Sequence, residues 1–255
     1  MNRPQNELLN GLRDWYNTVP PITRTLFMAT LGLSVLGGLR LVNPYFLVLV
    51  WPDAITKFQV WRLFTSFFFH KLGFAFVMNL YFLYQYSQDL ETQAFGNRTA
   101  DYLFFVLFVM GLELIASYFL SLFLLGDALM LALVYVWSQH FRHKIVSFLF
   151  GFTFKAVYLP WVLVAYDILL GSGIPTGLIV GIVTGHTYWF LDSVYPAAGG
   201  PRLLRTPQLL YRFFPQVRGG YTMGGGVEAI PGRAAQQAAA ATGGYSWGRG
   251  QRLGT

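Results

Sequence analysis

Side chains able to do chemistry are few and scattered in this sequence. The chain has no cysteine, which excludes disulfides, thiol nucleophiles and cysteine-ligated metals. Its four histidines do not have the spacing of a metal cluster, and they are His70, His140, His143 and His186. We therefore expect no metal and no cofactor. An acyl-transfer enzyme would need a serine held by one of these histidines.

The last nine residues, WGRGQRLGT from Trp247 to Thr255, form the most distinctive pattern of the chain. They follow residues 217–246, where glycine and alanine abound, a composition that builds no core and is typical of a disordered linker. The pattern predicts a short binding motif on a tether that recruits a soluble partner. The alternative is a low-complexity tail without a binding role.

Composition assigns the rest of the chain to the membrane. Of its 255 residues, 55% are hydrophobic and only 11% are charged, against about 25% charged in an average globular domain. The formal net charge is +7, but the basic residues lie in loops and tail beside apolar segments, where they set topology and contact anionic lipid. We expect an integral membrane protein that binds no nucleic acid.

Hydrophobicity predicts about six membrane-spanning helices. A span needs about 20 mainly apolar residues, and several of these candidates are shorter, so they must tilt little or lie in thinned lipid. The candidates are residues 25–39, 73–88, 102–125, 128–139, 158–170 and 175–195.

An even number of spans puts both termini on one side of the membrane. If that side is the cytosol, fourteen of the basic residues are cytosolic, and the far side keeps only Arg40, Lys57, Arg62 and Lys71. The positive-inside rule therefore favours cytosolic termini.

Short helices are expected outside the spans, on the cytosolic surface. One is an interfacial helix within residues 1–23, where apolar residues recur at helical spacing. In a second, Thr206 can cap the helix and Pro207 can open it. The expected domains are 1–23, a membrane domain over 24–196, an interfacial helix within 197–216, and a disordered tail over 217–255.

Polar residues at membrane depth are costly, and they are therefore functional candidates. Asn79, Gln85 and Glu113 are the main ones, and Asp167 lies nearer the far interface. They could line a polar groove that offers hydrogen bonds to an unfolded chain. Asn79 and Gln85 could instead be ordinary hydrogen bonders between helices.

Glycines recur at every fourth position of the sixth span, at Gly177, Gly181 and Gly185. In lipid such a face lets a neighbouring backbone approach closely, so we expect it to pack inside the bundle. We interpret His186 as a neutral imidazole that bonds across helices.

A series of short motifs runs through nearly the whole chain. They are VPPITR at 19–24, WP at 51–52, WR at 61–62, NLYFLYQYS at 79–87 with LE at 90–91, ADYLF at 100–104, FKA at 154–156, YLPW at 158–161, GH at 185–186 and TPQ at 206–208. In this order they resemble the derlin family, catalytically dead relatives of rhomboid intramembrane proteases. The resemblance implies an all-α, rhomboid-like membrane bundle of the endoplasmic reticulum that acts in ER-associated degradation, within the ubiquitin–proteasome pathway.

The main alternative is an active rhomboid-type intramembrane serine protease. Rhomboid proteases hold a serine in a Gly-x-Ser-Gly turn of the fourth span and a histidine in the sixth, and His186 matches the histidine. The fourth span here has no serine before Ser138 at its end and no flanking glycines. Without a nucleophile held by its base there is no acyl transfer, so we expect no enzyme.

The tail also resembles the Trp-Gly-x-Gly-x-x-Leu-Gly motif by which derlins bind the AAA ATPase valosin-containing protein. The resemblance implies two anchors, glycines that lie flush in a groove, and an arginine that pairs with an acidic rim. These residues are Trp247, Gly248, Gly250, Arg252, Leu253 and Gly254.

Trp61 and Arg62 lie in an apolar loop on the expected far side. An indole favours the interface, and a guanidinium with five donors can gather loop carbonyls or lipid phosphates. The residues are either an ordinary anchor or, as the family suggests, part of a loop that enters the leaflet sideways and disturbs it.

The expected function is that of a non-catalytic retrotranslocation factor for misfolded proteins of the endoplasmic reticulum. Its expected partners are misfolded protein clients, membrane lipid, a membrane ubiquitin ligase complex and the AAA ATPase, with a homo-oligomer left open.

Overall fold

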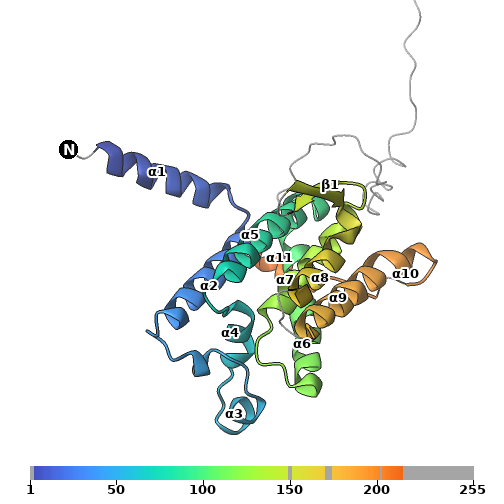
Figure 1. Cartoon of the computed structure of the whole chain (residues 1–255). Helices are drawn as coiled ribbons and strands as arrows, with labels where there is room; N and C mark the ends of the chain where they lie inside the picture. Colours follow the sequence, from blue (N-terminus) through green and yellow to red (C-terminus); the bar gives the residue numbers. More distant parts are fainter. Residues whose placement is uncertain (1–2, 149–150, 170–173, 202, 215–255) are drawn as a thin grey trace, which may run out of the picture. The chain divides into compact units, whose positions relative to one another are not determined.

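The computed structural model describes residues 3–148, 151–169, 174–201 and 203–214, mainly as helices (Figure 1). Six of these helices match the six expected apolar segments to within several residues. They are α2 (Pro21–Gly38), α5 (Phe74–Asp89), α6 (Thr99–Leu120), α7 (Gly126–His140), α8 (Leu159–Leu169) and α9 (Thr176–Trp189).

Only α6, among the described residues, is both long and apolar enough to cross a membrane by itself. Its 22 residues rise about 33 Å, whereas the 15 of α7 rise about 23 Å. A shorter apolar helical stretch covers Ala156–Leu169. The prediction of helices is confirmed at all six places, while the crossing of the membrane stays a prediction for each of them.

The remaining elements are short, apart from α1 (Arg3–Thr18), which is the helix expected near the start. The loop after α2 holds α3 (Trp51–Thr56) and α4 (Arg62–Phe68), and a hairpin of β1 (Ile145–Phe148) and β2 (Phe152–Lys155) follows α7. The hairpin was not expected from the sequence. Single π-helical turns at Leu90–Ala94 and Phe190–Val194 extend α5 and α9, and α10 (Tyr195–Ala197) and α11 (Gln208–Phe213) come last.

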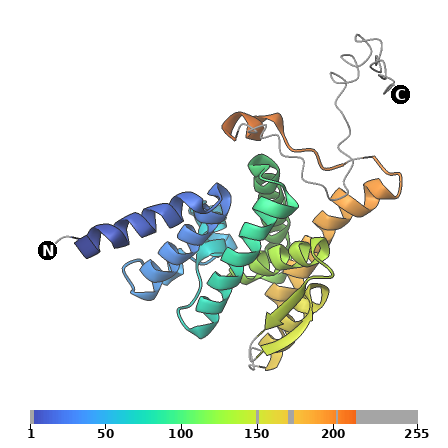
Figure 2. The same ribbon diagram turned by 90° about the horizontal axis from the view of Figure 1, so that it is seen from above.

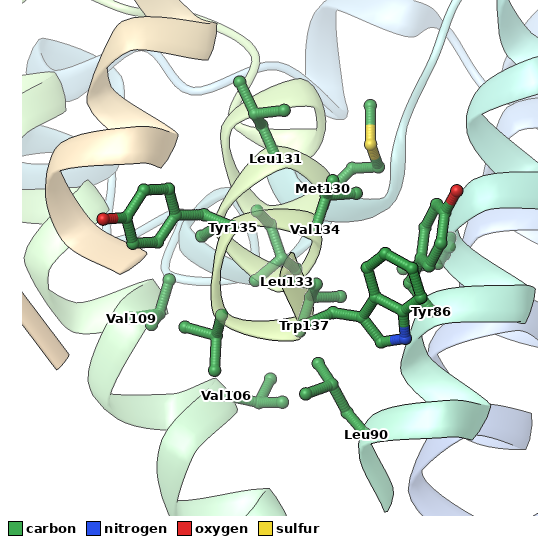
Figure 3. Close-up of a cluster of buried hydrophobic side chains, with 14 of the residues drawn as sticks. Tyr86, Leu90, Val106, Val109, Met130, Leu131, Leu133, Val134, Tyr135 and Trp137 are labelled. Atoms are coloured by element: carbon green, nitrogen blue, oxygen red, sulfur yellow. The ribbon is translucent and has the colours of Figure 1, made fainter. Parts of the chain in front are cut away.

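Helix α7 forms the centre of the core. It is apolar on all sides, as is typical of a buried helix, and every residue from Ala128 to Ser138 is buried. Tyr135 and Trp137 point to opposite sides of it (Figure 3), and the Trp137 ring lies 4.4 Å from that of Tyr86 on α5. Helices α2, α5, α7 and α9 pack in succession (Figures 1 and 2).

A buried polar network joins the ends of α2, α5 and α6. The Glu91 carboxylate accepts hydrogen bonds from the backbone N–H groups of Ile22 and Thr23, at 3.2 and 2.8 Å, and from the Thr23 hydroxyl at 2.8 Å. Ser87 continues the network to the hydroxyls of Thr23 and Tyr102, at 2.9 and 2.6 Å. Glu91 thus satisfies first-turn N–H groups of α2 that have no partner within that helix.

Candidate functional site

Arg62 holds together the loop between α2 and α5. Its side chain is fully buried, and its guanidinium donates to the backbone carbonyls of Tyr45 and Val48, the latter at 2.8 Å. Its Nε donates to Gln59 at 2.6 Å, and Nη2 lies 3.7 Å from an oxygen of Asp53. One side chain therefore ties residues that precede α3 to residues within and after it.

Asp53 is the acidic counterpart of Arg62. Its carboxylate accepts a hydrogen bond of 2.6 Å from the Tyr45 hydroxyl and forms an ion pair of 2.9 Å with Lys57. These hydrogen bonds lower the pKa of Asp53, with that of Tyr45 first. The carboxylate is therefore held ionised beside Arg62.

The outer face of the same loop is apolar. Trp61, beside the buried Arg62, is 48% exposed, and Phe58 is 81% exposed. Other exposed apolar side chains on this loop are Ile55, Val60 and Phe64. Exposed apolar side chains on an ordered loop suit contact with lipid or protein.

The glycines of α9 do not all behave alike. A Cβ on Gly181 would lie 2.3 Å from the carbonyl oxygen of Ala128, and one on Gly185 would lie 2.9 Å from that of Ala132. Gly181 and Gly185 therefore let the backbone of α7 approach α9 closely. For Gly177 the expectation of close packing is wrong, because no heavy atom of a neighbour lies within 4 Å of such a Cβ. It lies in the first turn of α9, beside a cavity.

His186 bonds to a tyrosine rather than to a serine. The Tyr135 hydroxyl on α7 lies 2.6 Å from Nδ1 of His186 on α9. Ser138, the serine of α7, is fully buried and donates to the carbonyl of Tyr135 at 2.7 Å. Among the residues that the structure describes, no serine hydroxyl bonds to His186.

The three polar residues expected to form one groove lie in different places. Asn79 on α5 donates to Asp127 on α7 at 2.7 Å. Glu113 is fully buried on α6, where Oε1 accepts from Thr184 of α9 at 3.2 Å and Oε2 has no partner in the described chain. Gln85 is half-buried, and its side chain makes no hydrogen bond with the described residues. The structure thus does not unite Asn79, Gln85 and Glu113.

Asn79 instead lines a cavity of about 280 Å³, which we call the acidic cavity. Residues of α5, α7, α8 and the start of α9 form its walls, and Asp127 and Asp167 are the two carboxylates among them. Sequence reasoning placed Asp167 near the far interface but missed Asp127. Its position at the edge of the fourth apolar segment was the available signal.

Thr206 does not cap α11, contrary to expectation. Its hydroxyl donates to Asp101 of α6 at 2.7 Å, and the Tyr211 hydroxyl donates to the same oxygen. Arg98 pairs with the other oxygen of Asp101 at 3.1 Å. This carboxylate attracts Thr206 away from the N-terminus of α11, where no side chain caps the helix.

The tail motif lies outside the described residues, and so do its candidates Trp247, Gly248, Gly250, Arg252, Leu253 and Gly254.

Comparison with known proteins identifies relatives along almost the whole chain. A family model described as the Der1-like family matches residues 19–208. Derlin-1 of Homo sapiens is 43% identical over 252 residues, which cover 96% of this chain and 99% of that protein. Derlin-1 of Oryza sativa subsp. japonica is 38% identical and covers 80% of this chain and 86% of its own. Derlin-2.2 of Zea mays is 36% identical, with coverages of 81% and 88%.

Proposed function

The chain belongs to the Der1-like family, that of the derlins, and on this basis we propose that it is a non-catalytic retrotranslocation factor. It receives misfolded proteins in the membrane of the endoplasmic reticulum, disturbs the bilayer around them, and recruits a AAA ATPase of the valosin-containing protein type through its C-terminal tail.

The observation that carries this proposal is the extent of the family match. It runs from residue 19 to residue 208 and so includes all six apolar helices and the loop of Arg62. Membership supports a role in ER-associated degradation and a place in the membrane of the endoplasmic reticulum. Both termini are proposed to be cytosolic, which leaves the loop of Arg62 on the luminal side.

Disturbance of the bilayer is assigned to that loop. Its inner face is fixed by the Arg62 guanidinium, and its outer face carries exposed apolar side chains such as Phe58 and Trp61. A loop whose Tyr45 and Val48 carbonyls are bonded to Arg62 and whose outer side chains are apolar can enter the headgroup region. The short helices around it suit a thinned bilayer.

Extraction is assigned to the ATPase partner, because the chain offers no energy source of its own. Trp247 and Leu253 are the proposed anchors, and Gln251 occupies a variable position of the motif. A membrane ubiquitin ligase complex is the other proposed partner. Truncation of an anchor residue typically costs about 2 kcal/mol or more, which is about thirtyfold in affinity.

The test of recruitment is titration of a labelled peptide of residues 244–255 into the N-terminal domain of the ATPase. Trp247→Ala with Leu253→Ala should abolish detectable binding, and Gln251→Ala should leave it unchanged. If the mutant and wild-type peptides bind equally, or neither binds, the tail does not recruit the ATPase.

The test of the loop is the half-life of a misfolded client in cells that depend on this chain. Arg62→Ala and Trp61→Ala should slow client removal, while Arg40→Ala, which changes an exposed arginine at the start of the same loop, should not. Wild-type half-lives in the first two variants would remove the loop from the mechanism.

The alternative of an active serine protease has its own test. Labelling of the purified protein by a fluorophosphonate probe, or cleavage of a model transmembrane substrate, that is lost in His186→Ala would refute the non-catalytic proposal.

A further inference from the structure

Two carboxylates and no lysine, arginine or histidine are found among the described residues that line the acidic cavity. Asp127 and Asp167 line it, and none of its lining residues is basic. Asp167 forms no ion pair with any described residue, and the Asp127 side chain is 50% exposed and accepts one hydrogen bond, from Asn79. The rest of the wall is largely apolar and includes Met78, Phe82 and Leu163. Two carboxylates on one half-exposed wall attract a cationic partner by charge.

A buried histidine points to the same conclusion. A second cavity, of about 270 Å³, shares Asn79 and Asp127 with the acidic cavity, and His70 lines it. His70 is only 9% exposed, and neither of its ring nitrogens has a hydrogen-bond partner in the described chain, although Nε2 lies 3.5 Å from Asp127. A buried polar group without a partner is costly. The imidazole beside Asp127 leaves both ring nitrogens available to a polar ligand.

From these observations we propose that the acidic cavity binds the basic side chain of a polypeptide segment, arginine in preference to lysine. The inference rests on the proposed role in handling clients, because it defines which clients the site favours. Arginine has five N–H donors in a planar fork that matches carboxylates, and its methylene stem tolerates apolar walls. The favoured clients carry arginine beside apolar residues.

Lys71 gives the proposal a charge-specific check. It lines the second cavity and is exposed, yet it forms no ion pair with Asp127. A cation already paired with that carboxylate would compete with a basic ligand. Lys71, which is not paired with Asp127, only repels a basic ligand.

The experiment is a binding titration with the purified full chain in maltoside micelles, which contain no cationic group. The probes are three labelled apolar peptides that differ only at one central residue, which is arginine, glutamine or glutamate. The arginine peptide should bind at least about tenfold more tightly than the other two. Equal affinities for the arginine and glutamine peptides would overturn the proposal.

Variants of the protein locate the site. Asp127→Asn and Asp167→Asn keep the shape of each side chain and should weaken the arginine peptide about tenfold or more, with the glutamine peptide unaffected. Asp14→Asn, a change on the distant α1, is the matched control. Lys71→Ala should bind the arginine peptide at least as tightly as wild type, and weaker binding would contradict the electrostatic argument.

A lipid headgroup is the rival source of a cation. The titration is therefore repeated in nanodiscs of phosphatidylcholine. Retained binding supports a polypeptide ligand, whereas binding in micelles that disappears in nanodiscs would assign the cavity to choline and overturn the proposal. None of these readouts needs client removal or the ATPase, so the inference can fail while the proposed function stands, and the reverse.

Discussion

The three glycines of α9 allow a graded test of the contact between α7 and α9. Gly181→Ala brings a Cβ to 2.3 Å from the backbone oxygen of Ala128. A backbone atom cannot rotate away as the end of a flexible side chain could. Overpacking of this kind costs about 1–3 kcal/mol, while the higher helix propensity of alanine returns at most about 1 kcal/mol. We expect a net loss of about 1–2 kcal/mol in the free energy of unfolding.

The other two glycines calibrate this value. In Gly185→Ala the nearest backbone oxygen is 2.9 Å away, so a small shift relieves the contact and the loss should be smaller. In Gly177→Ala the new Cβ meets open space, so stability should equal that of wild type or exceed it by at most about 1 kcal/mol through helix propensity. The order of stability should therefore be Gly177→Ala, then Gly185→Ala, then Gly181→Ala.

The assay is thermal unfolding of each variant in identical nanodiscs at one scan rate, followed by the total tryptophan fluorescence, to which the buried Trp137 contributes. A single scan rate matters because membrane proteins often unfold irreversibly, so only relative melting temperatures are comparable. If Gly177→Ala loses as much stability as Gly181→Ala, the loss does not come from a contact between a Cβ at residue 181 and Ala128, and the described contact is wrong.

Three further predictions concern polar contacts. Arg62→Ala should leave the Tyr45 and Val48 carbonyls without their donor, at a cost of about 1–3 kcal/mol. Proteases should therefore cut within residues 42–71 faster than in wild type or Arg40→Ala. Equal cutting in Arg62→Ala and Arg40→Ala would mean that Arg62 does not hold the loop together. Asp101→Ala should remove the acceptor for Thr206 and Tyr211 and speed hydrogen exchange in residues 203–214 about tenfold. The control variant Asp14→Ala should leave this exchange unchanged. Unchanged exchange in Asp101→Ala would mean that other contacts hold α11. Burial raises the pKa of Glu91 above its ordinary 4.5, although the amide and hydroxyl of Thr23 favour the ionised form. The contribution of Glu91 to the free energy of unfolding is therefore full below pH 4.5 and is lost as the pH rises through the higher pKa of the folded state. Melting temperatures measured from pH 4.5 to neutral should fall in wild type and fall less in Glu91→Gln, and parallel curves would contradict this assignment.

The positions of the helices could be predicted from the sequence, because long apolar runs separated by glycine, proline and charged residues determine them locally. All six apolar segments became helices, with ends displaced by a few residues. The ordered structure of the loop at residues 42–71 could not be predicted. It depends on the Arg62 guanidinium reaching carbonyls 14 and 17 residues earlier in the chain, and no local pattern signals such a contact.

The site was harder to predict because periodicity gives the face of a helix but not its neighbour. Asn79 and Glu113 are both polar residues in apolar helices, yet Asn79 faces α7 and Glu113 faces α9. Thr206 has the sequence context of a helix cap, but its hydroxyl bonds to Asp101, 105 residues away. Long-range partners of this kind override local preference.

The packing of α9 on α7 also determines the geometry of the acidic cavity. Gly181 meets the carbonyl of Ala128, and Ala128 directly follows Asp127, which lines the cavity. Any shift of the α7 backbone that accommodates a Cβ at residue 181 therefore moves the Asp127 carboxylate, which accepts a hydrogen bond from Asn79 and lies beside His70. Gly185 contacts α7 four residues further on, at Ala132, about one helical turn beyond Ala128. Gly181 thus determines the position of the Asp127 carboxylate as well as the distance between α7 and α9, whereas Gly185 determines only that distance.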